Sequence, residues 1–271
     1  MVEEKEKIMD KVAIISDVHG NLTALNAVLK DIDSKGITKI YCLGDSVIKC
    51  ANPDKVVDIL RDRCEVILKG NCDEVVCRPG IEFGKFWSRD IIGEERADFL
   101  YNCPVCHEFY MSGHLIRLFH ASPFSLEHIF NPMYGNVDTL YYNIIRNPED
   151  LFKNTEFIGK TEKDPIPDVI GYGHLHTPNL FRFKNKTIFN VGSVGVPVEM
   201  LNESEDDETN KFSTMASYVY LEGNFGSKKL SNFNITLARV AYCIDDEIKS
   251  LEESNMPNKD MIIKSLKTAI H

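Results

Sequence analysis

The feature that most constrains the fold is a short apolar run near the N-terminus that stops abruptly at polar residues. Val12–Ile15 is followed by Asp17, His19 and Gly20. The run predicts a buried strand, and the glycine allows the backbone to turn sharply behind it. Ligands collect outside the carboxyl ends of parallel strands, and Asp oxygen and neutral His nitrogen both coordinate Zn, Mn or Fe. Asp17 and His19 are therefore candidate metal ligands at a strand end.

Four further apolar runs stop at polar residues in the same way. They are Ile40–Leu43 before Gly44 and Asp45, Val66–Leu68 before Gly70, Asn71 and Asp73, Leu115–Phe119 before His120, and Val169–Ile170 before Gly173, His174 and His176. Repetition of the pattern favours one shared site over a series of accidents. The candidate metal ligands are Asp17, His19, Asp45, Asn71, His120, His174 and His176.

In this order and at these spacings, the motifs resemble those of the calcineurin-like metallophosphoesterase superfamily. Asn190–Gly195 also resembles the family's Asn-Pro-Gly-Ser-Val-Gly turn, with Val191 in place of the proline. The resemblance covers about residues 11 to 243. Among the branches, the bacterial and archaeal phosphodiesterase-like group is the most similar, because Gly70–Asp73 reads Gly-Asn-Cys-Asp.

The resemblance implies an α/β fold, a four-layer α/β/β/α sandwich in which two mixed sheets pack face to face with helices outside. It also implies two divalent ions, because seven ligands exceed the four that one Zn ion takes. The first ion would be held by Asp17, His19 and His176, the second by Asn71, His120 and His174, and Asp45 would bridge them. The mixed nitrogen and oxygen ligands favour Mn, Fe, Ni or Zn over Ca or Mg.

The implied reaction is phosphoester hydrolysis by a hydroxide that bridges the two metals, with no covalent enzyme intermediate. Asp45, Asn71, Cys72 and Asp73 are the residues assigned to catalysis, with Asp73 orienting a ligand. Cys72 departs from the wider family, in which a histidine after the asparagine protonates the leaving group or stabilises the transition state. Loss of that proton transfer costs on the order of 10²- to 10⁴-fold and disfavours monoesters with poor leaving groups. Alternatively, Cys72 is a packing thiol and substrate choice lies elsewhere.

Three functions follow from these motifs. The leading hypothesis is a phosphodiesterase or dinucleotide pyrophosphohydrolase that acts on a small, nucleotide-like substrate. The second is a phosphomonoesterase of the same fold, including a protein Ser/Thr phosphatase, because metal ligands do not separate the two. The third is a non-catalytic scaffold, resembling a retromer subunit of the superfamily, and it predicts missing ligands.

Charge and hydropathy limit the classes of protein to which the chain can belong. The 31 basic and 41 acidic residues give a formal charge of −10, which argues against a protein that binds nucleic acid through backbone charge. No run of about 18 apolar residues exists, so we expect no membrane span. Residues 1–10 are charged and lack the apolar core of a signal peptide, so we expect a cytoplasmic protein.

The eight cysteines are expected to stay reduced, and Cys103 and Cys106 are expected to be half-buried thiols. The oligomeric state stays open.

Periodicity predicts the remaining elements within a single domain over 1–271. Helices are expected at 22–33, after Asn52 as cap and Pro53, and at 92–101. Strands are expected at 65–69, 187–191, 216–221 and 234–242, with antiparallel pairing from Thr187 onward. A tail over 244–271 should form two amphipathic helices, at 245–253 and 259–270, and the acidic 203–208 stretch a solvated loop.

The 53 residues between His120 and His174 exceed what one crossover needs. We interpret 121–168 as an insertion that shapes the substrate cleft, with a short helix or strand at 140–145. The candidate substrate contacts are Asn21, His128, Asn131, Tyr134 and Tyr141.

Overall fold

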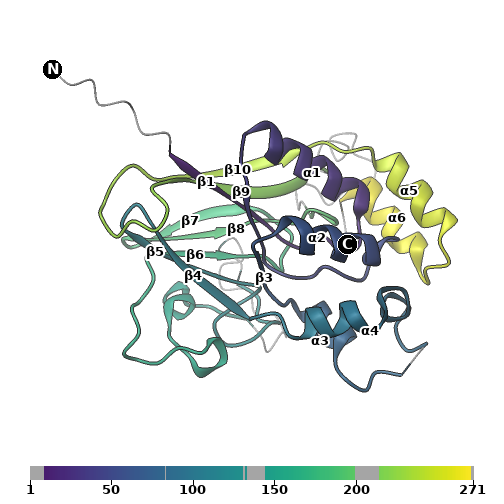
Figure 1. The fold of residues 1–271 in the computed structure, drawn as a ribbon, viewed down its shortest axis with the longest axis horizontal. Coiled ribbons are helices and arrows are strands. Elements are labelled where there is room, and N and C mark those ends of the chain that lie inside the picture. The colour runs from purple at the N-terminus through teal and green to yellow at the C-terminus, as the bar shows by residue number, and fades with distance from the viewer. Residues whose placement is uncertain (1–8, 83, 131, 133–143, 199–213, 270–271) are drawn as a thin grey trace.

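The computed structural model describes residues 9–82, 84–130, 132, 144–198 and 214–269. They form two five-stranded mixed sheets that pack against each other (Figure 1). In the first sheet the order is β10 (Asn234–Val240), β9 (Ala216–Gly223), β1 (Asp10–Ile15), β2 (Lys39–Cys42) and β3 (Val66–Ile67). In the second it is β4 (Cys106–Met111), β5 (His114–Phe119), β6 (Val169–Tyr172), β8 (Lys186–Asn190) and β7 (Asn179–Phe183).

The centre of the first sheet is built from the predicted strand, turn and helix. β1 pairs in parallel with β2, with Ile14 opposite Tyr41. The crossover between them is α1 (Leu22–Ser34), whose buried side chains repeat at helical spacing and face the sheet. Parallel pairing brings the carboxyl ends of β1, β2 and β3 to one edge. The polar residues that follow these strands are therefore neighbours.

α2 (Pro53–Arg63) returns the chain from β2 to β3. Pro53 occupies the first turn, as predicted, because its missing N–H is one of those left unbonded there. Asn52 occupies the N-cap position, as predicted, but its side chain makes no cap hydrogen bond. Asn52 Nδ2 instead donates to Ser250 Oγ at 2.8 Å, and so links the loop to the C-terminal part of the chain.

The second sheet contains two strands that periodicity did not predict, β4 and β7. Both are outer strands that pair antiparallel with one neighbour. β7 alternates half-buried and exposed residues and lacks a continuous apolar run, so its hydrophobic signal is weak. β8 pairs in parallel with β6 on its other side, so the predicted antiparallel pattern from Thr187 onward is only half correct.

The main hydrophobic layer lies between the two sheets. Val12 and Ile14 of β1 meet Ile116 and Leu118 of β5 there, and all four are fully buried. The opposite face of the first sheet is covered by α1 and α2. Buried side chains on both faces explain why these strands read as continuous apolar runs.

The outer face of the second sheet is covered by described parts of the 121–168 segment. These include two 3-10 helices, η1 (Pro148–Phe152) and η2 (Glu156–Ile158). Leu151 and Phe152 pack on Ile170 and Ile188 of the sheet. The element predicted at 140–145 lies largely outside the described residues, and so does the acidic 203–208 stretch.

Helices α3 (Asn71–Cys77) and α4 (Trp87–Tyr101) pack together beside α2. α4 begins five residues before the predicted start, and its helical geometry is broken at Gly93, where φ is 71°. That break explains why the apolar periodicity is readable only from Ile92 onward.

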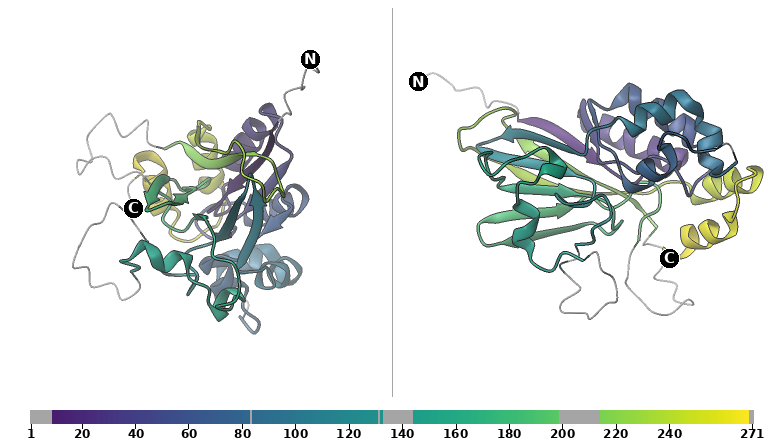
Figure 2. Two further views of the ribbon diagram at one scale, coloured as in Figure 1. Left: turned by 90° about the vertical axis from the view of Figure 1, so that its left-hand side faces the viewer. Right: turned by 90° about the horizontal axis from the view of Figure 1, so that it is seen from below.

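The C-terminal part forms α5 (Ile244–Glu253) and α6 (Lys259–Thr268), close to the predicted ranges. In Figure 1 they lie in yellow at the end of the molecule away from the start of β1, and Figure 2 repeats this arrangement from two further sides. None of the helices in the described residues is long and apolar enough to cross a bilayer. The predicted α/β class with two mixed sheets is confirmed.

Candidate metal centre

The seven candidate ligands follow the carboxyl ends of five strands and meet where the two sheets join. Backbone hydrogen bonds fasten the ligand-bearing turns to one another. Asp17 N donates to Gly44 O at 3.0 Å, His19 N to Asp45 O at 3.0 Å, and Gly173 N to His120 O at 2.8 Å. The predicted ligands are thereby held close together, with Asp17, His19, Asp45, His120 and His176 buried and Asn71 and His174 half-buried.

One half of the cluster contains Asp17, His19 and His176. Their ligand atoms lie within 4.8 Å of one another, and all three side chains are buried. Asp17 Oδ1 lies 3.2 Å from His176 Nε2 and 3.8 Å from His19 Nε2. Within the described residues, this buried oxygen has no hydrogen-bond partner. A buried carboxylate oxygen without a partner is costly unless a cation sits beside it.

The other half contains Asn71, His120 and His174. Asn71 Oδ1 is 3.0 Å from His120 Nε2 and 3.1 Å from His174 Nδ1. The backbone N–H of His174 donates to Asp17 Oδ2 at 3.0 Å, which ties this half to the first.

Asp45 lies between the two halves and turns one oxygen toward each. Its Oδ2 is 3.7 Å from His19 Nε2, and its Oδ1 is 3.6 Å from His120 Nε2. The same Oδ1 accepts the Cys72 N–H at 2.9 Å. Gly70 permits this approach, because a Cβ there would lie 2.0 Å from Asp45 Oδ1.

The hydrogen bonds of three histidines decide which ring nitrogen faces the centre. The Nδ1 atoms of His19, His120 and His176 lie 3.0, 3.0 and 2.6 Å from the carbonyl oxygens of Val47, Leu43 and Val196. A carbonyl only accepts, so each Nδ1 carries a proton, and Nε2 is the ring nitrogen that can bind a metal once it carries none. This outer hydrogen bond is how metal-binding histidines are oriented in proteins.

Two of these nitrogens lie close together. His19 Nε2 and His176 Nε2 face each other at 3.1 Å. Two lone pairs at this distance repel each other unless a proton or a metal ion lies between or beside them. The donor set of imidazole nitrogens, carboxylates and an amide oxygen is one that divalent transition metals accept. The residues present therefore fit a divalent metal site.

The pKa shifts of His19, His174 and Asp17 favour the forms that bind metal. Burial lowers the pKa of His19 to about 3 and that of His174 to about 4, so both rings are neutral at pH 7. Burial acts to raise the pKa of Asp17, but the surrounding histidines, His176 foremost, together outweigh it and lower the pKa. His120 behaves differently, because Asp45 and Asp17 raise its pKa against the effect of burial. Neutral imidazoles and ionised carboxylates are the ligand forms.

The backbone of the centre is strained. Asp17, His19, Asp45, His174 and His176 have φ between 51° and 66°, the left-handed region that side chains rarely adopt. Each such residue costs on the order of 1 to 3 kcal/mol and persists only where the surroundings enforce it. Five strained ligands in one cluster indicate that the fold maintains this geometry for function.

Asp73 fastens the Asp45 and Asn71 turns from behind. It is fully buried and accepts N–H bonds from Asp45 at 2.8 Å, Ser46 at 3.0 Å and Gly70 at 3.1 Å. Burial and the charge of Asp45 raise its pKa to about 7, while these N–H groups act in the opposite direction. Asp73 thus lies where a residue that orients ligands should lie.

Two residues that we did not assign to the site also hold its turns. Ser193 Oγ donates to Asp17 O at 2.7 Å, and Asn190 Nδ2 donates to Gly173 O at 2.6 Å. Both belong to the Asn190–Gly195 turn. Its resemblance to a family motif was the signal that could have identified them.

The remaining predicted site residues lie around the centre or away from it. Cys72 is half-buried, and its Sγ lies within 4.8 Å of ligand atoms of His19 and Asp45. Asn21 is fully buried. Its Nδ2 donates a hydrogen bond to Gly195 O at 2.8 Å, and its Oδ1 accepts one from Ala24 N at 2.9 Å, so both ends of the amide stabilise the fold. His128 is half-buried with its ring 6.1 Å from that of Phe124. Tyr134 lies outside the described residues, as do Asn131 and Tyr141. Their contacts with substrate stay predictions.

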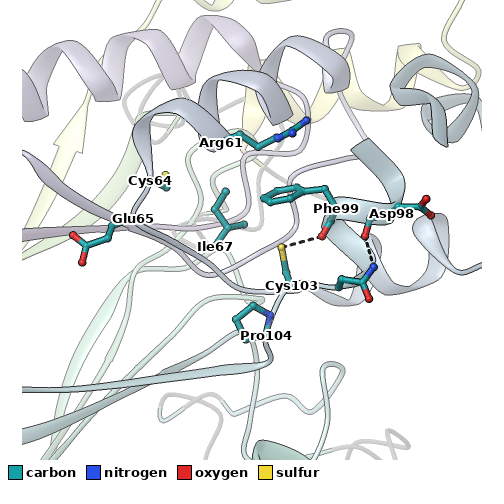
Figure 3. A pocket seen from close by; sticks show the side chains of 9 residues that line it. Arg61, Cys64, Glu65, Ile67, Asp98, Phe99, Cys103 and Pro104 are labelled. Atoms are coloured by element: carbon teal, nitrogen blue, oxygen red, sulfur yellow. Dashed lines mark hydrogen bonds between the residues drawn. The ribbon is translucent and has the colours of Figure 1, made fainter. Parts of the chain in front are cut away.

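The centre is distinct from a cavity of about 530 Å³ beside β3, which Figure 3 shows from close by. Arg61, Phe99 and Cys103 are among its lining residues, and none of the candidate ligands lines it. Cys103 is a buried free thiol whose Sγ donates to Phe99 O at 3.4 Å. Cys106 is half-buried, and all eight cysteines are free thiols.

Known proteins resemble both the sequence and the fold. Residues 10–206 match the model of the calcineurin-like phosphoesterase superfamily domain. The chain is 29% identical over 259 residues to an uncharacterized protein of Methanocaldococcus jannaschii, covering 92% of this chain and 95% of that one.

Two solved structures share the fold. A metallophosphoesterase from Sphaerobacter thermophilus has a TM-score of 0.66 at 22% identity, over 96% of this chain and 99% of that one. A hypothetical protein from Pyrococcus horikoshii has the same TM-score of 0.66 at 16% identity, and the match covers 97% of this chain and 99% of that one. The chain therefore belongs to the calcineurin-like phosphoesterase superfamily and is a metal-dependent phosphoric ester hydrolase.

Proposed function

We propose that the chain is a two-metal phosphodiesterase or dinucleotide pyrophosphohydrolase acting on a small, nucleotide-like substrate. The observation that carries the proposal is the position of Asp45, which turns one oxygen toward His19 and the other toward His120. A carboxylate shared in this way between two sets of ligands is typical of two-metal phosphoesterases. Retention of all seven ligands argues against a non-catalytic scaffold.

The residues that would hold the two ions form the two halves of the cluster described above. Asp17, His19 and His176 would hold one ion, Asn71, His120 and His174 the other, and Asp45 would contact both. Manganese, iron, nickel or zinc suit this donor set. When bound, two such ions lower the pKa of water toward neutrality and neutralise charge on the phosphoryl oxygens.

The chain's own residues contribute rigidity. The histidine rings are fixed by their Nδ1–H bonds to carbonyls, and Asp45 and Asp17 are buried, so no side chain needs to reorganise during the reaction. Asn71 supplies a neutral oxygen in place of another carboxylate. This leaves more positive charge available to the substrate.

Cys72 supports the choice of substrate class. Burial and the nearby Asp45 carboxylate raise the pKa of its thiol well above the ordinary value. So weak an acid does not protonate an alkoxide efficiently. Substrates whose leaving group is already stable as an anion, such as a nucleoside phosphate or an aryl oxide, are disfavoured least.

The test is hydrolysis of a substrate panel by the full chain loaded in turn with Mn, Ni, Zn and Mg. The panel contains bis-p-nitrophenyl phosphate, p-nitrophenyl phosphate, a diadenosine polyphosphate and a phosphopeptide. We expect kcat/KM for the diester or the dinucleotide to exceed that for the phosphopeptide by about tenfold or more, because of these substrates only the phosphopeptide releases an alkoxide. Asp45→Asn should abolish turnover and reduce metal occupancy. Preference for the phosphopeptide, or full activity of Asp45→Asn, would contradict the proposal.

A further inference from the structure

A second cavity lies within the 121–168 segment, on the part of the chain that follows His120. Its volume is about 410 Å³, which is in the range of pockets that hold small-molecule ligands. Phe124, His128 and Arg146 are among its lining residues. None of the seven candidate metal ligands lines this cavity, and the proposed hydrolysis makes no use of it. The cavity is therefore available for a separate binding function.

Packing keeps this cavity near the metal centre. Its lining residue Ile145 belongs to one hydrophobic cluster with Phe119 and Tyr172. Phe119 directly precedes the ligand His120, and Tyr172 ends the strand β6 that leads into the next ligand turn. On the other wall, Phe124 follows His120 by four residues, so their Cα atoms are at most about 14 Å apart. A phosphate at the centre and a group in the cavity are thus within reach of one dinucleotide.

The turn that carries Phe124 is held in place by hydroxyl groups. Ser122 Oγ accepts hydrogen bonds from the backbone N–H groups of Phe124 and Ser125, each at 3.1 Å. Thr155 Oγ1 donates to Pro123 O and ties the turn to the start of η2. Phe124 is nevertheless 37% exposed. An exposed aromatic ring on a fixed turn offers a preformed face on which a planar ligand stacks.

His128 and Arg146 complete the character of the cavity. The His128 ring lies 6.1 Å from that of Phe124, at an interplanar angle of 39°, so the two rings form an aromatic wall. The exposed Arg146 guanidinium makes no hydrogen bond or ion pair within the part of the chain that the structure describes. The lining carboxylate, Asp150, is already paired with Lys153 at 2.7 Å. An aromatic wall beside an available positive charge suits a planar ligand that carries phosphate.

We propose that this cavity binds the nucleobase of a nucleotide whose phosphate is hydrolysed at the metal centre. The assignment rests on the proposed phosphoester hydrolysis and specifies its substrate class. Phe124 stacks on the base, and Arg146 pairs with a phosphate oxygen that lies between the base and the centre. Every base has a π-face, so this contact gives affinity for nucleotides in general and not for one base.

The first test is binding of adenosine monophosphate and of inorganic phosphate to the manganese-loaded full chain by calorimetry. Phe124→Ala should weaken binding of the nucleotide roughly 5- to 100-fold, as expected for loss of one stacked base, and should change phosphate binding less than about twofold. Phe124→Trp should bind the nucleotide at least as well as the wild type. Arg146→Met should weaken nucleotide binding by roughly 2- to 5-fold, because exposed charge pairs are weak.

Phe157→Ala is the matched control. Phe157 belongs to the same segment and is 40% exposed, but it does not line the cavity. This variant should bind adenosine monophosphate like the wild type. An equal loss in Phe124→Ala and Phe157→Ala would show a general weakening of the segment and would overturn the nucleobase site.

Hydrolysis separates this assignment from the function on which it rests. In Phe124→Ala we expect KM for a diadenosine polyphosphate to rise by the factor seen in nucleotide binding, with kcat changed little. Nucleotide affinity equal to wild type in both Phe124→Ala and Arg146→Met would overturn the nucleobase site and leave the hydrolase proposal intact. A manganese-loaded wild type that hydrolyses neither bis-p-nitrophenyl phosphate nor the dinucleotide would overturn the proposed function and this assignment with it.

Discussion

At the scale of single residues, the centre depends on groups that never touch a metal. His19, His120 and His176 present Nε2 only because a backbone carbonyl holds each Nδ1. Asp73 has an equivalent role for the backbone, since its two oxygens accept three N–H groups from the turns that carry Asp45 and Asn71. Such supporting contacts are worth roughly 10- to 100-fold in metal affinity.

Replacing Asp73 by Asn tests this role. An amide keeps one acceptor oxygen and turns an NH₂ group toward N–H donors, so at least one buried N–H loses its partner. We expect a loss of stability on the order of 2 to 3 kcal/mol in urea unfolding and a 10- to 100-fold weaker metal affinity by calorimetry. Glu74→Gln, one residue along α3 and outside this network, is the control and should change metal affinity little. Unaltered metal affinity in Asp73→Asn would show that the turns hold their shape without it.

At the scale of elements, α5 is joined to the helix that follows the first ligand turn. The fully buried Glu247 accepts a hydrogen bond from Thr23 Oγ1 of α1 at 2.8 Å. Burial raises the pKa of Glu247. The folded state therefore favours the protonated carboxyl, and its contribution to stability is present at low pH and lost as pH rises above the value in the unfolded chain.

Glu247→Gln should make this dependence visible. The variant keeps the shape and a neutral acceptor, so it should be more stable than the wild type at pH 8 and differ less from it near pH 4.5. Urea unfolding of both proteins across this range measures the difference. Glu253→Gln, on the exposed end of the same helix, should leave the pH dependence unchanged. A wild type that gains stability on the alkaline side relative to Glu247→Gln would contradict a raised pKa for this carboxyl.

At the scale of the whole molecule, the centre joins two sheets. Contacts such as His120 Nδ1–H to Leu43 O at 3.0 Å and His174 N–H to Asp17 Oδ2 at 3.0 Å run from one sheet to the other. The buried Asp17 carboxylate and the facing His19 and His176 nitrogens leave a place in which a cation would be favoured. Metal binding should therefore stabilise the entire fold.

Removal of metal by a chelator should lower the melting temperature of the chain. Ions present at about 100 times their Kd contribute about 2.7 kcal/mol per site, which corresponds to a shift of roughly 5 to 10 °C. Scanning calorimetry with and without Mn²⁺ measures the shift. Asp45→Asn should show a much smaller difference between the two conditions. Equal melting temperatures for wild type with and without metal would mean that the ligands close together without a cation.

Many of the strands and helices could be predicted from the sequence because their hydrophobic patterns were strong. Continuous apolar runs marked β1, β2, β5 and β6, helical spacing marked α1, and each ligand stood at the polar end of its run. The weaker signals failed for physical reasons. β7 is half exposed, and α4 is broken at Gly93.

The sequence by itself determined the order of the strands' polar endings and the residue types there, because strand hydrophobicity and ligand chemistry are local properties. Only the tertiary structure decided which nitrogen each histidine presents and that Asp45 faces both halves. These depend on carbonyls, turns and strained backbone brought together from distant parts of the chain, and no local pattern encodes such contacts.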